Sequence, residues 1–220
     1  MMNIFNIFDP STSMKFSLNW LSMLIFLVLM PYQFWFIPSR FIMFWMLILS
    51  FLTKEFKVLI KYSYSNIIIF LSLFVFILMN NFLGLFPYIF TASSHMSFCF
   101  SMSITMWLGM MIYGWLNFYN DMFSHLTPQG TPVILMPFMV MIETISLIIR
   151  PLTLAIRLSA NMIAGHLLMS LLGSTGSSMF NYMLIILIFT QILLLTLELS
   201  VSIIQAYVFS ILSTLYSSEI

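Results

Sequence analysis

Long apolar runs separated by short polar segments fill most of the chain. A helix needs about 20 apolar residues to cross the ~30 Å hydrocarbon layer of a bilayer, and three runs have roughly that length: 18–38, 66–90 and 96–118. Two later runs, 133–172 and 179–217, are almost twice as long. The pattern predicts an all-α, multi-pass integral membrane protein that folds as one domain over residues 1–220.

The segment 40–61 has a different pattern. Its uncharged part is roughly 13 residues long, which is too short to span a bilayer. Lys54, Lys57 and Lys61 recur at steps that place them on one helical face. The segment is therefore predicted to be an amphipathic helix lying in the membrane interface, with a short spanning helix as the alternative. Its positive charge marks the matrix or cytoplasmic side.

The two longest runs are each long enough for about 60 Å of helix. The length allows two predictions: helices that are broken near Pro137 or Pro151, or helices that lie strongly tilted in the membrane. We favour strong tilt with a local kink, because neither run has charged ends suited to water. A Gly/Ser loop at 173–178 joins the runs, so they are predicted to form an antiparallel hairpin.

Composition excludes several classes of protein. Hydrophobic residues make up 62% of the chain and charged residues 6%, whereas a soluble domain has about 25% charged residues. A net charge of +1 argues against nucleic-acid binding. The one cysteine, Cys99, excludes an internal disulfide and reads as a small buried hydrophobe. No motif for a cofactor or metal is visible, and His95 and His125 lie in predicted turns, where we expect surface side chains.

Only five formally charged residues occur between positions 62 and 218. One of them, Asp121, lies in a predicted loop (119–132). The other four lie inside the long apolar runs: Glu143, Arg150, Arg157 and Glu198. An ionisable group at the centre of a membrane helix costs at least ~2.5–3.5 kcal/mol, so each of these four is a functional candidate.

Polar residues recur every seven positions in both long runs. Seven residues at 100° each leave successive members only ~20° apart, so each set forms one polar face. The first set is Glu143, Arg150 and Arg157, extended by Asn161, and the second set is Gln191, Glu198 and Gln205.

The two polar faces allow two interpretations. In the first, Arg157 and Glu198 form a buried salt bridge that holds the hairpin together. The attraction within a buried ion pair roughly cancels the cost of removing both charges from water. A purely structural role is therefore disfavoured. In the second, the faces line a hydrated path or proton relay. His166, nine residues after Arg157, points to the opposite face and is either a packing residue or part of that relay.

Five motifs stand out between residues 80 and 216. They are Asn81-Phe-Leu-Gly-Leu-Phe-Pro-Tyr88, His125-Leu-Thr-Pro-Gln-Gly-Thr-Pro-Val133, Ile142-Glu-Thr-Ile-Ser-Leu-Ile-Ile-Arg-Pro151, Ile156-Arg-Leu-Ser-Ala-Asn-Met-Ile-Ala-Gly-His-Leu-Leu-Met169 and Ile204-Gln-Ala-Tyr-Val-Phe209. In order and spacing they resemble the subunit a family of F-type ATP synthases. The combination of His166 and Glu198 resembles the mitochondrial branch of that family.

The resemblance implies a proton-translocating stator subunit of the rotary membrane sector, located in the mitochondrial inner membrane and not an enzyme by itself. Arg157 resembles the family's essential arginine, which faces the rotor c-ring. The other matching positions are associated with two half-channels: Glu143, Asn161, His166, Glu198 and Gln205. Arg150 matches no critical family position and is the natural counter-charge of Glu143. The implied partners are the c-ring, other membrane-sector and peripheral-stalk subunits, lipid and protons, with no nucleic acid or cofactor.

Three alternatives remain at this stage. A stand-alone proton channel or secondary transporter often shows two related halves, and no internal repeat is visible. A quinone- or haem-binding respiratory subunit is disfavoured by the sparse histidines. A purely structural anchor does not account for two polar faces inside apolar helices.

Overall fold

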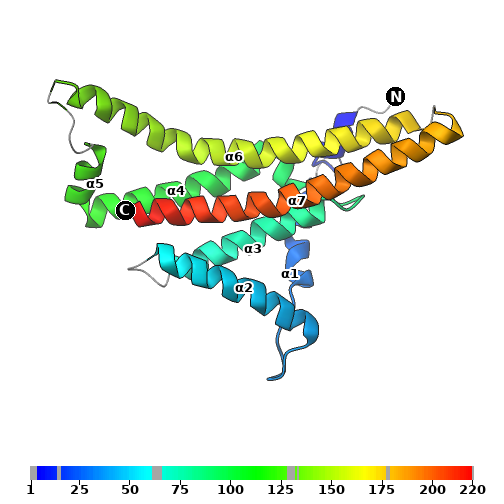
Figure 1. Ribbon diagram of the computed structural model, residues 1–220, viewed down its shortest axis with the longest axis horizontal. Helices are drawn as coiled ribbons and strands as arrows, with labels where there is room; N and C mark the ends of the chain where they lie inside the picture. The colour runs from blue at the N-terminus through cyan, green and yellow to red at the C-terminus, as the bar shows by residue number, and fades with distance from the viewer. Residues whose placement is uncertain are drawn as a thin grey trace.

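The computed structural model describes residues 4–13, 16–60, 66–127, 132, 134–176 and 179–219. Helices account for all of the regular structure in these ranges (Figure 1). The long helices are α2 (Arg40–Leu59), α3 (Asn66–Gly84), α4 (Met96–Asn117), α6 (Met136–Thr175) and α7 (Asn181–Glu219). Four of them, α3, α4, α6 and α7, are long and apolar enough to cross a membrane. The predicted all-α, multi-pass membrane fold is confirmed.

Helices α6 and α7 run antiparallel along the whole length of the molecule (Figure 1). They are continuous over 40 and 39 residues, so the alternative of broken helices is wrong. Pro137 lies in the first turn of α6, where a missing N–H breaks no helical hydrogen bond. Pro151 lies inside the helix, and α6 is visibly curved, as expected where a proline removes one backbone bond. Each helix is about 60 Å long, which favours the predicted tilt.

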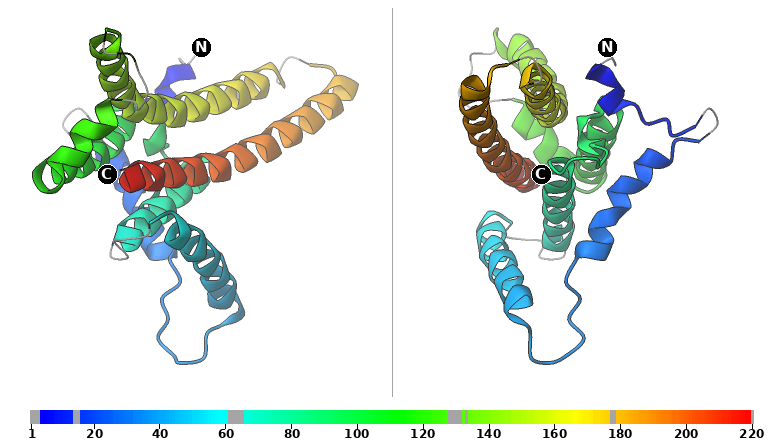
Figure 2. Two further views of the ribbon diagram at one scale, coloured as in Figure 1. Left: turned by 60° about the vertical axis from the view of Figure 1, so that its left-hand side comes forward. Right: turned by 90° about the vertical axis from the view of Figure 1, so that its right-hand side faces the viewer.

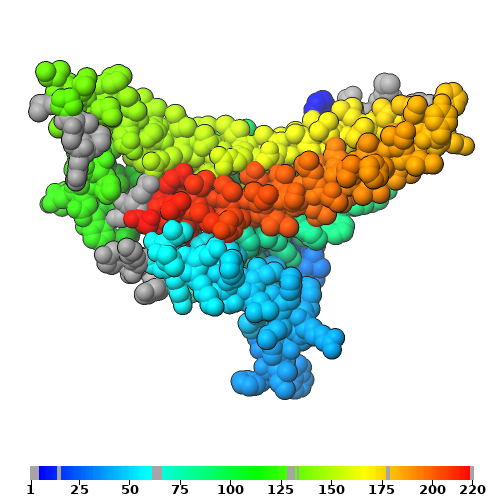
Figure 3. All heavy atoms as spheres, in the orientation of Figure 1, coloured from blue at the N-terminus to red at the C-terminus, as the bar shows by residue number. Residues whose placement is uncertain are grey.

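Helices α3 and α4 support the hairpin from one side, with α3 packed against α7 and α4 against α6. The shared core draws on all four helices, with buried side chains that include Phe74, Cys99, Leu158 and Phe209. Cys99 is a buried residue, as predicted, and its Sγ donates a hydrogen bond to the backbone oxygen of Ser93 at 3.1 Å. Because α3 and α4 cover only this side, the opposite side of the hairpin is left exposed (Figure 3).

The N-terminal part contains the short helices η1 (Ile4–Phe8), η2 (Leu18–Leu24) and α1 (Ile25–Leu29). The predicted span 18–38 is therefore too long. Helix formation stops before Pro31, which disfavours a helical conformation in the residue preceding it. The chain then runs as a long connection into α2 (Figure 2).

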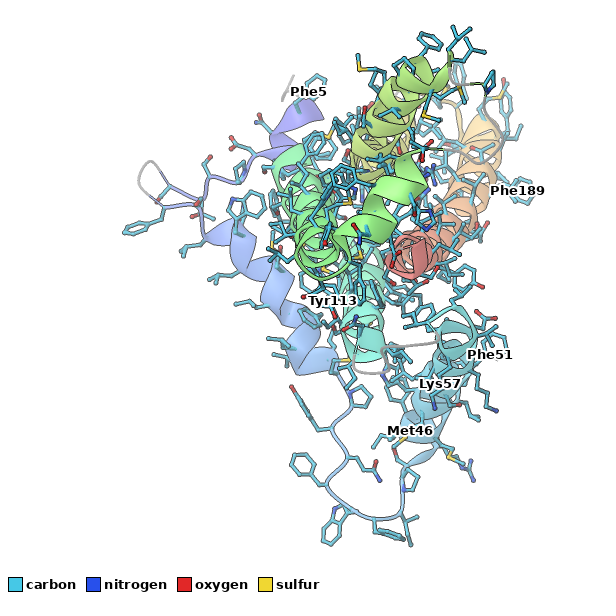
Figure 4. All side chains as sticks on the ribbon, turned by 90° about the vertical axis from the view of Figure 1, so that its left-hand side faces the viewer. Phe5, Met46, Phe51, Lys57, Tyr113 and Phe189 are labelled. Atoms are coloured by element: carbon cyan, nitrogen blue, oxygen red, sulfur yellow. The ribbon has the colours of Figure 1, made fainter. Side chains whose placement is uncertain are left out.

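Ser39 caps the N-terminus of α2, because its hydroxyl accepts a hydrogen bond from the Ile42 amide. One face of α2 packs on the rest of the protein through Phe56, which is fully buried. The other face carries Lys54 and Lys57, which are exposed. Lys57 is labelled in Figure 4. The helix thus has the apolar and basic faces that the sequence predicts, and its place in the membrane interface stays a prediction. Lys61 lies outside the described residues.

Helix α2 is also tied to the hairpin through a polar contact. The Tyr207 hydroxyl on α7 donates a hydrogen bond of 3.0 Å to a carboxylate oxygen of Glu55 on α2. This contact joins two segments that are 152 positions apart in the chain. It holds α2 next to α7 and α3, so the basic face of α2 has a fixed position relative to the hairpin.

Two connections differ from the sequence prediction. The loop 119–132 begins with a helix, α5 (Tyr119–Leu126), with Asp121 in its first turn, where negative charge is favourable. Residues 128–131 and 133 lie outside the described residues. The prediction that His95 is a surface residue is wrong, because its Nε2 is buried and its ring packs against those of Trp20 and Phe90.

Candidate functional site

Arg157 lies in the middle of α6 and is exposed. It is the one exposed charged residue of this helix, since Glu143 and Arg150 are half-buried. The exposed positions nearest to it are apolar or small, and they include Ile156, Ala160, Ala164 and Leu168. A guanidinium is always protonated, so α6 presents a permanent positive charge on an otherwise apolar surface.

Arg157 and Glu198 do not form the buried salt bridge that was one interpretation of the sequence. Among the described residues, the ion pair of this hairpin joins Glu143 and Arg150 instead. Glu198 lies against Gly165, eight positions beyond Arg157 on α6. Eight helical residues correspond to about 12 Å, which is too far for a direct contact.

The Glu198 carboxyl group fits onto α6 at a position without a side chain. A Cβ placed on Gly165 would lie 2.5 Å from one carboxylate oxygen of Glu198 and 2.8 Å from its carboxyl carbon. Glu198 is only 8% exposed, and neither carboxylate oxygen has a hydrogen-bond partner within the described ranges. A buried carboxyl group without a hydrogen-bond partner is expected to bind water or to exchange a proton with another titratable group.

His166 directly follows Gly165 and is half-buried. Its Nε2 is buried and has no hydrogen-bond partner in the described part of the chain. The residue lines a cavity of about 1030 Å³, together with Ser170 on α6 and Gln191 on α7. His166 thus lies between this cavity and Gly165, against which the Glu198 carboxyl packs. A residue that only fills a core would not have this position.

A second and smaller cavity, of about 80 Å³, lies among α4, α5, α6 and α7. The carboxylate of Glu143 and the guanidinium of Arg150 approach to 3.7 Å at this cavity, which confirms the predicted pairing of their charges. The Arg150 guanidinium also lies 5.1 Å from the centre of the Tyr216 ring, in cation–π geometry. His125 and Trp115 complete this polar and aromatic lining.

The two cavities lie on either side of Arg157 along the hairpin and share no lining residue. Glu143 precedes Arg157 by 14 positions, or about 21 Å of helix, and Gly165 follows it at about 12 Å. The large cavity lies where α3 ends, and the small cavity lies beside the last turns of α4. Along α6, Arg157 thus lies between the residues that line the small cavity and those that line the large cavity.

Asn161 and Gln205 lie close to the level of Arg157. Asn161 is one turn further along α6 and is half-exposed. In the antiparallel register, Glu198 faces Gly165 and the side chain of Gln191 lies near Gly173. Continuing this register places Arg157 level with Ala206, next to Gln205, which is also half-exposed.

The predicted polar stripe of α6 is divided. Glu143 and Arg150 face the small cavity, whereas Arg157 is exposed on the surface. Two steps of seven residues already turn the helix by ~40°, and Pro151 lies between Arg150 and Arg157. Helix geometry therefore separates the ion pair from the exposed guanidinium.

Two residues of this region, Gly165 and Asn81, are not evident as site residues from the sequence alone. Gly165 was part of a motif, and a small residue in a membrane helix is the general signal for close approach of a second helix. Asn81 is only 1% exposed, and both atoms of its side-chain amide lack partners among the described residues. A buried and unsatisfied amide is not visible in a sequence, because its partners come from distant segments.

The sequence model of the ATP synthase A chain family matches residues 16–218, which is nearly the whole chain. The chain belongs to the ATP synthase A chain family. It is 57% identical over 222 residues to "ATP synthase subunit a" of Drosophila melanogaster, covering 100% of this chain and 99% of that protein. The identity to "ATP synthase subunit a" of Anopheles quadrimaculatus is 57% over 224 residues, and to that of Locusta migratoria 55% over 223 residues, with the same coverage.

Membership of the ATP synthase A chain family confirms the resemblance seen in the motifs. It makes the chain a membrane subunit of an ATP synthase, with a part in ATP synthesis and proton transport, and not an enzyme by itself. The interpretations as a haem- or quinone-binding subunit or as a simple anchor are thereby set aside.

The contact between Gly165 and Glu198 gives a test within this family. Gly165→Ala must displace the Glu198 carboxyl group, so proton-driven ATP synthesis should fall by about 10-fold or more. Gly109→Ala on α4 is the matched control, because a Cβ there meets nothing within 4 Å and alanine favours the helix. The measurement is ATP synthesis per assembled complex in vesicles. Equal rates for the two variants would show that the contact is unimportant.

Proposed function

We propose that this chain is the proton-translocating stator subunit of the rotary membrane sector, providing two half-channels and an essential arginine, Arg157. The observation that supports the proposal best is the position of Arg157, an exposed guanidinium between two cavities that share no lining residue. A single continuous pore would not need a fixed charge between two separate openings. A pair of half-channels does, because protons must not pass directly from one to the other.

The partner of Arg157 in this proposal is an anion on a neighbouring subunit. An exposed cation on an apolar surface inside a membrane is costly unless a counter-charge meets it there. Carboxylates carried by a rotor c-ring would meet this need, and Arg157 would favour their ionised form. The small side chains of Ala160 and Ala164 leave room for another helix to come close to α6. We assign the c-ring to this side of α6.

The large cavity is assigned to proton uptake during synthesis. Protons would pass from the cavity to His166 and on to Glu198, which lies against the neighbouring Gly165. Imidazole and carboxyl groups both exchange protons and are typical members of membrane proton relays. From Glu198 the proton would reach a rotor carboxylate, close to Asn161 and Gln205 in the hairpin.

The small cavity is assigned to proton release. A rotor carboxylate that arrives at Arg157 loses its proton, because the fixed positive charge stabilises the anion. The released proton would then leave along Glu143 and its neighbours at the other end of α6. The energy available is ~2.3 kcal/mol per charge for each 100 mV of membrane potential. Rotation of the ring would transmit this energy to the catalytic subunits.

We place the protein in the mitochondrial inner membrane. Support comes from the arrangement of His166 and Glu198, which resembles the mitochondrial branch of the family. The positive-inside rule assigns the basic face of α2, with Lys54 and Lys57, to the matrix side. The small cavity then opens toward the matrix, and the large cavity opens toward the intermembrane space.

Cysteine accessibility tests the two half-channels. Gln191→Cys, in the large cavity, should react with a small membrane-impermeant thiol reagent added from the intermembrane side only. Leu147→Cys, in the small cavity, should react from the matrix side only. The buried Cys99 of the unmodified chain provides the background. Labelling of both positions from the same side would contradict the proposal, because one continuous channel would then suffice.

A stand-alone proton channel or secondary transporter is the other functional class. It predicts that the purified chain, reconstituted without partner subunits, conducts protons rapidly. The stator function predicts only slow conduction by the isolated chain, because the rotor carboxylates that carry protons between the half-channels are missing. Proton flux into vesicles with a pH-sensitive dye distinguishes the two.

A further inference from the structure

The N-terminal segment takes part in the wall of the large cavity. Asn6, Asp9, Asn19 and Ser22 line it together with His166 and Gln191. Among the described residues that line it, Asp9 is the one with a formal charge, and its side chain is exposed. His166, whose Nε2 is buried, lines the same cavity. A carboxylate therefore lies on an exposed part of the cavity wall.

Several contacts hold the N-terminal segment in this position. The Ser22 hydroxyl donates a hydrogen bond of 3.0 Å to the backbone oxygen of Phe90, across 68 positions of the chain. The Trp20 ring packs edge-on against Phe90, at 5.6 Å between ring centres. Helix η1 also contacts α6, and the two lie together in Figure 1. The wall is thus built by tertiary packing and not by a loose terminus.

The Asp9 carboxylate is also fixed locally. The backbone amide and the hydroxyl of Ser11 both donate hydrogen bonds to Oδ1 of Asp9, at 3.1 and 2.8 Å. The Asn19 side chain donates to the Asp9 backbone oxygen at 3.1 Å. The Ser11 bonds stabilise the carboxylate and hold the pKa of Asp9 below its ordinary value. Asp9 therefore stays ionised across the physiological pH range, and its Oδ2 is available to water.

We propose that Asp9 is a proton-collecting carboxylate at the mouth of the large cavity, and that the N-terminal segment forms the outer wall of the uptake half-channel. This inference rests on the proposed function. A negative charge at the opening of a cleft raises the local concentration of cations, including hydronium. Among the described residues, the other titratable groups on the cavity are Tyr88, from the turn after α3, and His166, from α6, while α7 contributes the non-titrating Gln191.

The test is Asp9→Asn in the intact complex, reconstituted in vesicles, with ATP synthesis driven by an imposed potential. At pH 8 and low salt on the intermembrane side, the rate should fall about two- to fivefold, the factor expected for one unit charge acting over 4–8 Å of water. The deficit should shrink at pH 6, where protons are abundant. It should also shrink at 0.5 M salt, since ions screen an exposed charge. Asp9→Glu should restore the rate.

Two controls separate this inference from the function on which it rests. Asp121→Asn, an exposed aspartate on α5 that lines neither cavity, should leave the rate unchanged. Glu198→Gln should slow synthesis at every pH and salt concentration. If Glu198→Gln slows ATP synthesis and Asp9→Asn has the normal rate, then Asp9 does not collect protons, but the proposed half-channel is still supported. If both variants have normal rates, the proposed uptake path itself is wrong.

Discussion

Arg157→Ala is expected to abolish proton-driven ATP synthesis while the complex still assembles. The side chain is exposed on α6 and makes no ion pair within the described residues, so its removal leaves no buried charge behind in this chain. What is lost is the fixed cation that keeps each arriving rotor carboxylate ionised. We expect a residual rate on the order of 10⁻³ of the unmodified rate or less, comparable to losing a charge-stabilising group at a catalytic centre.

Arg157→Lys should also work poorly, because a compact ammonium that shifts its pKa on burial replaces a delocalised and permanent charge. Arg40→Ala provides the matched control: Arg40 is an exposed arginine at the start of α2, outside both cavities. It should leave ATP synthesis intact. Normal synthesis by Arg157→Ala in vesicles with a confirmed amount of complex would refute the role of Arg157.

Glu198→Gln is expected to have the second-largest effect, slowing proton flux by on the order of 10²-fold, within the range for losing a general acid–base. Glutamine has nearly the same size, so it fits against Gly165 without a clash. It carries no proton that can be passed on, however, and the relay from His166 is interrupted. The complex should remain stable, because the carboxylate has no hydrogen-bond partner to lose among the described residues.

Glu55→Gln is the matched control for the loss of a glutamate. Its carboxylate accepts a hydrogen bond from the Tyr207 hydroxyl on the outside of α7 and lies in neither cavity. We expect normal flux in this variant. Flux through Glu198→Gln that matches the control would remove Glu198 from the proton path.

The long helices could be predicted from the sequence because their signal is local. Apolar runs place both ends of α4, α6 and α7 within three residues, and the Gly/Ser loop joins α6 to α7 as predicted. The predicted run 66–90 has the correct start for α3 but is too long, because the helix ends at Gly84. The weakest prediction was the first span, where Pro31 ends the helix although the residues on both sides of it are apolar. Hydrophobicity reports the preferred solvent, and it does not report whether the backbone can stay helical.

The site was predicted where it depends on residue type and was missed where it depends on contact. Arg157, Glu198 and His166 could be singled out because charged and titratable groups are rare in apolar helices. The pairing of Glu198 with Gly165 comes from two helices packing side by side, and no spacing within one helix encodes it. The same holds for Asp9, which reaches the cavity only through the packing of the N-terminal segment.

The outer side of the hairpin is apolar and has no covering helix among the described residues. Large apolar side chains of α7, such as Phe189 and Leu197, are more than half exposed. Figure 4 shows Phe189 pointing away from the other helices. In a membrane these side chains contact lipid or another subunit, and Arg157 lies on the neighbouring helix of the same hairpin.

The most direct test is the distance from the Arg157 guanidinium to the nearest carboxylate of the rotor ring, measured in a structure of the assembled membrane sector. We predict a ring carboxylate within about 4 Å for a direct ion pair, or within about 7 Å if one water bridges the two groups. A ring that packs elsewhere, with Arg157 facing lipid or bulk water and no carboxylate near it, would contradict the account.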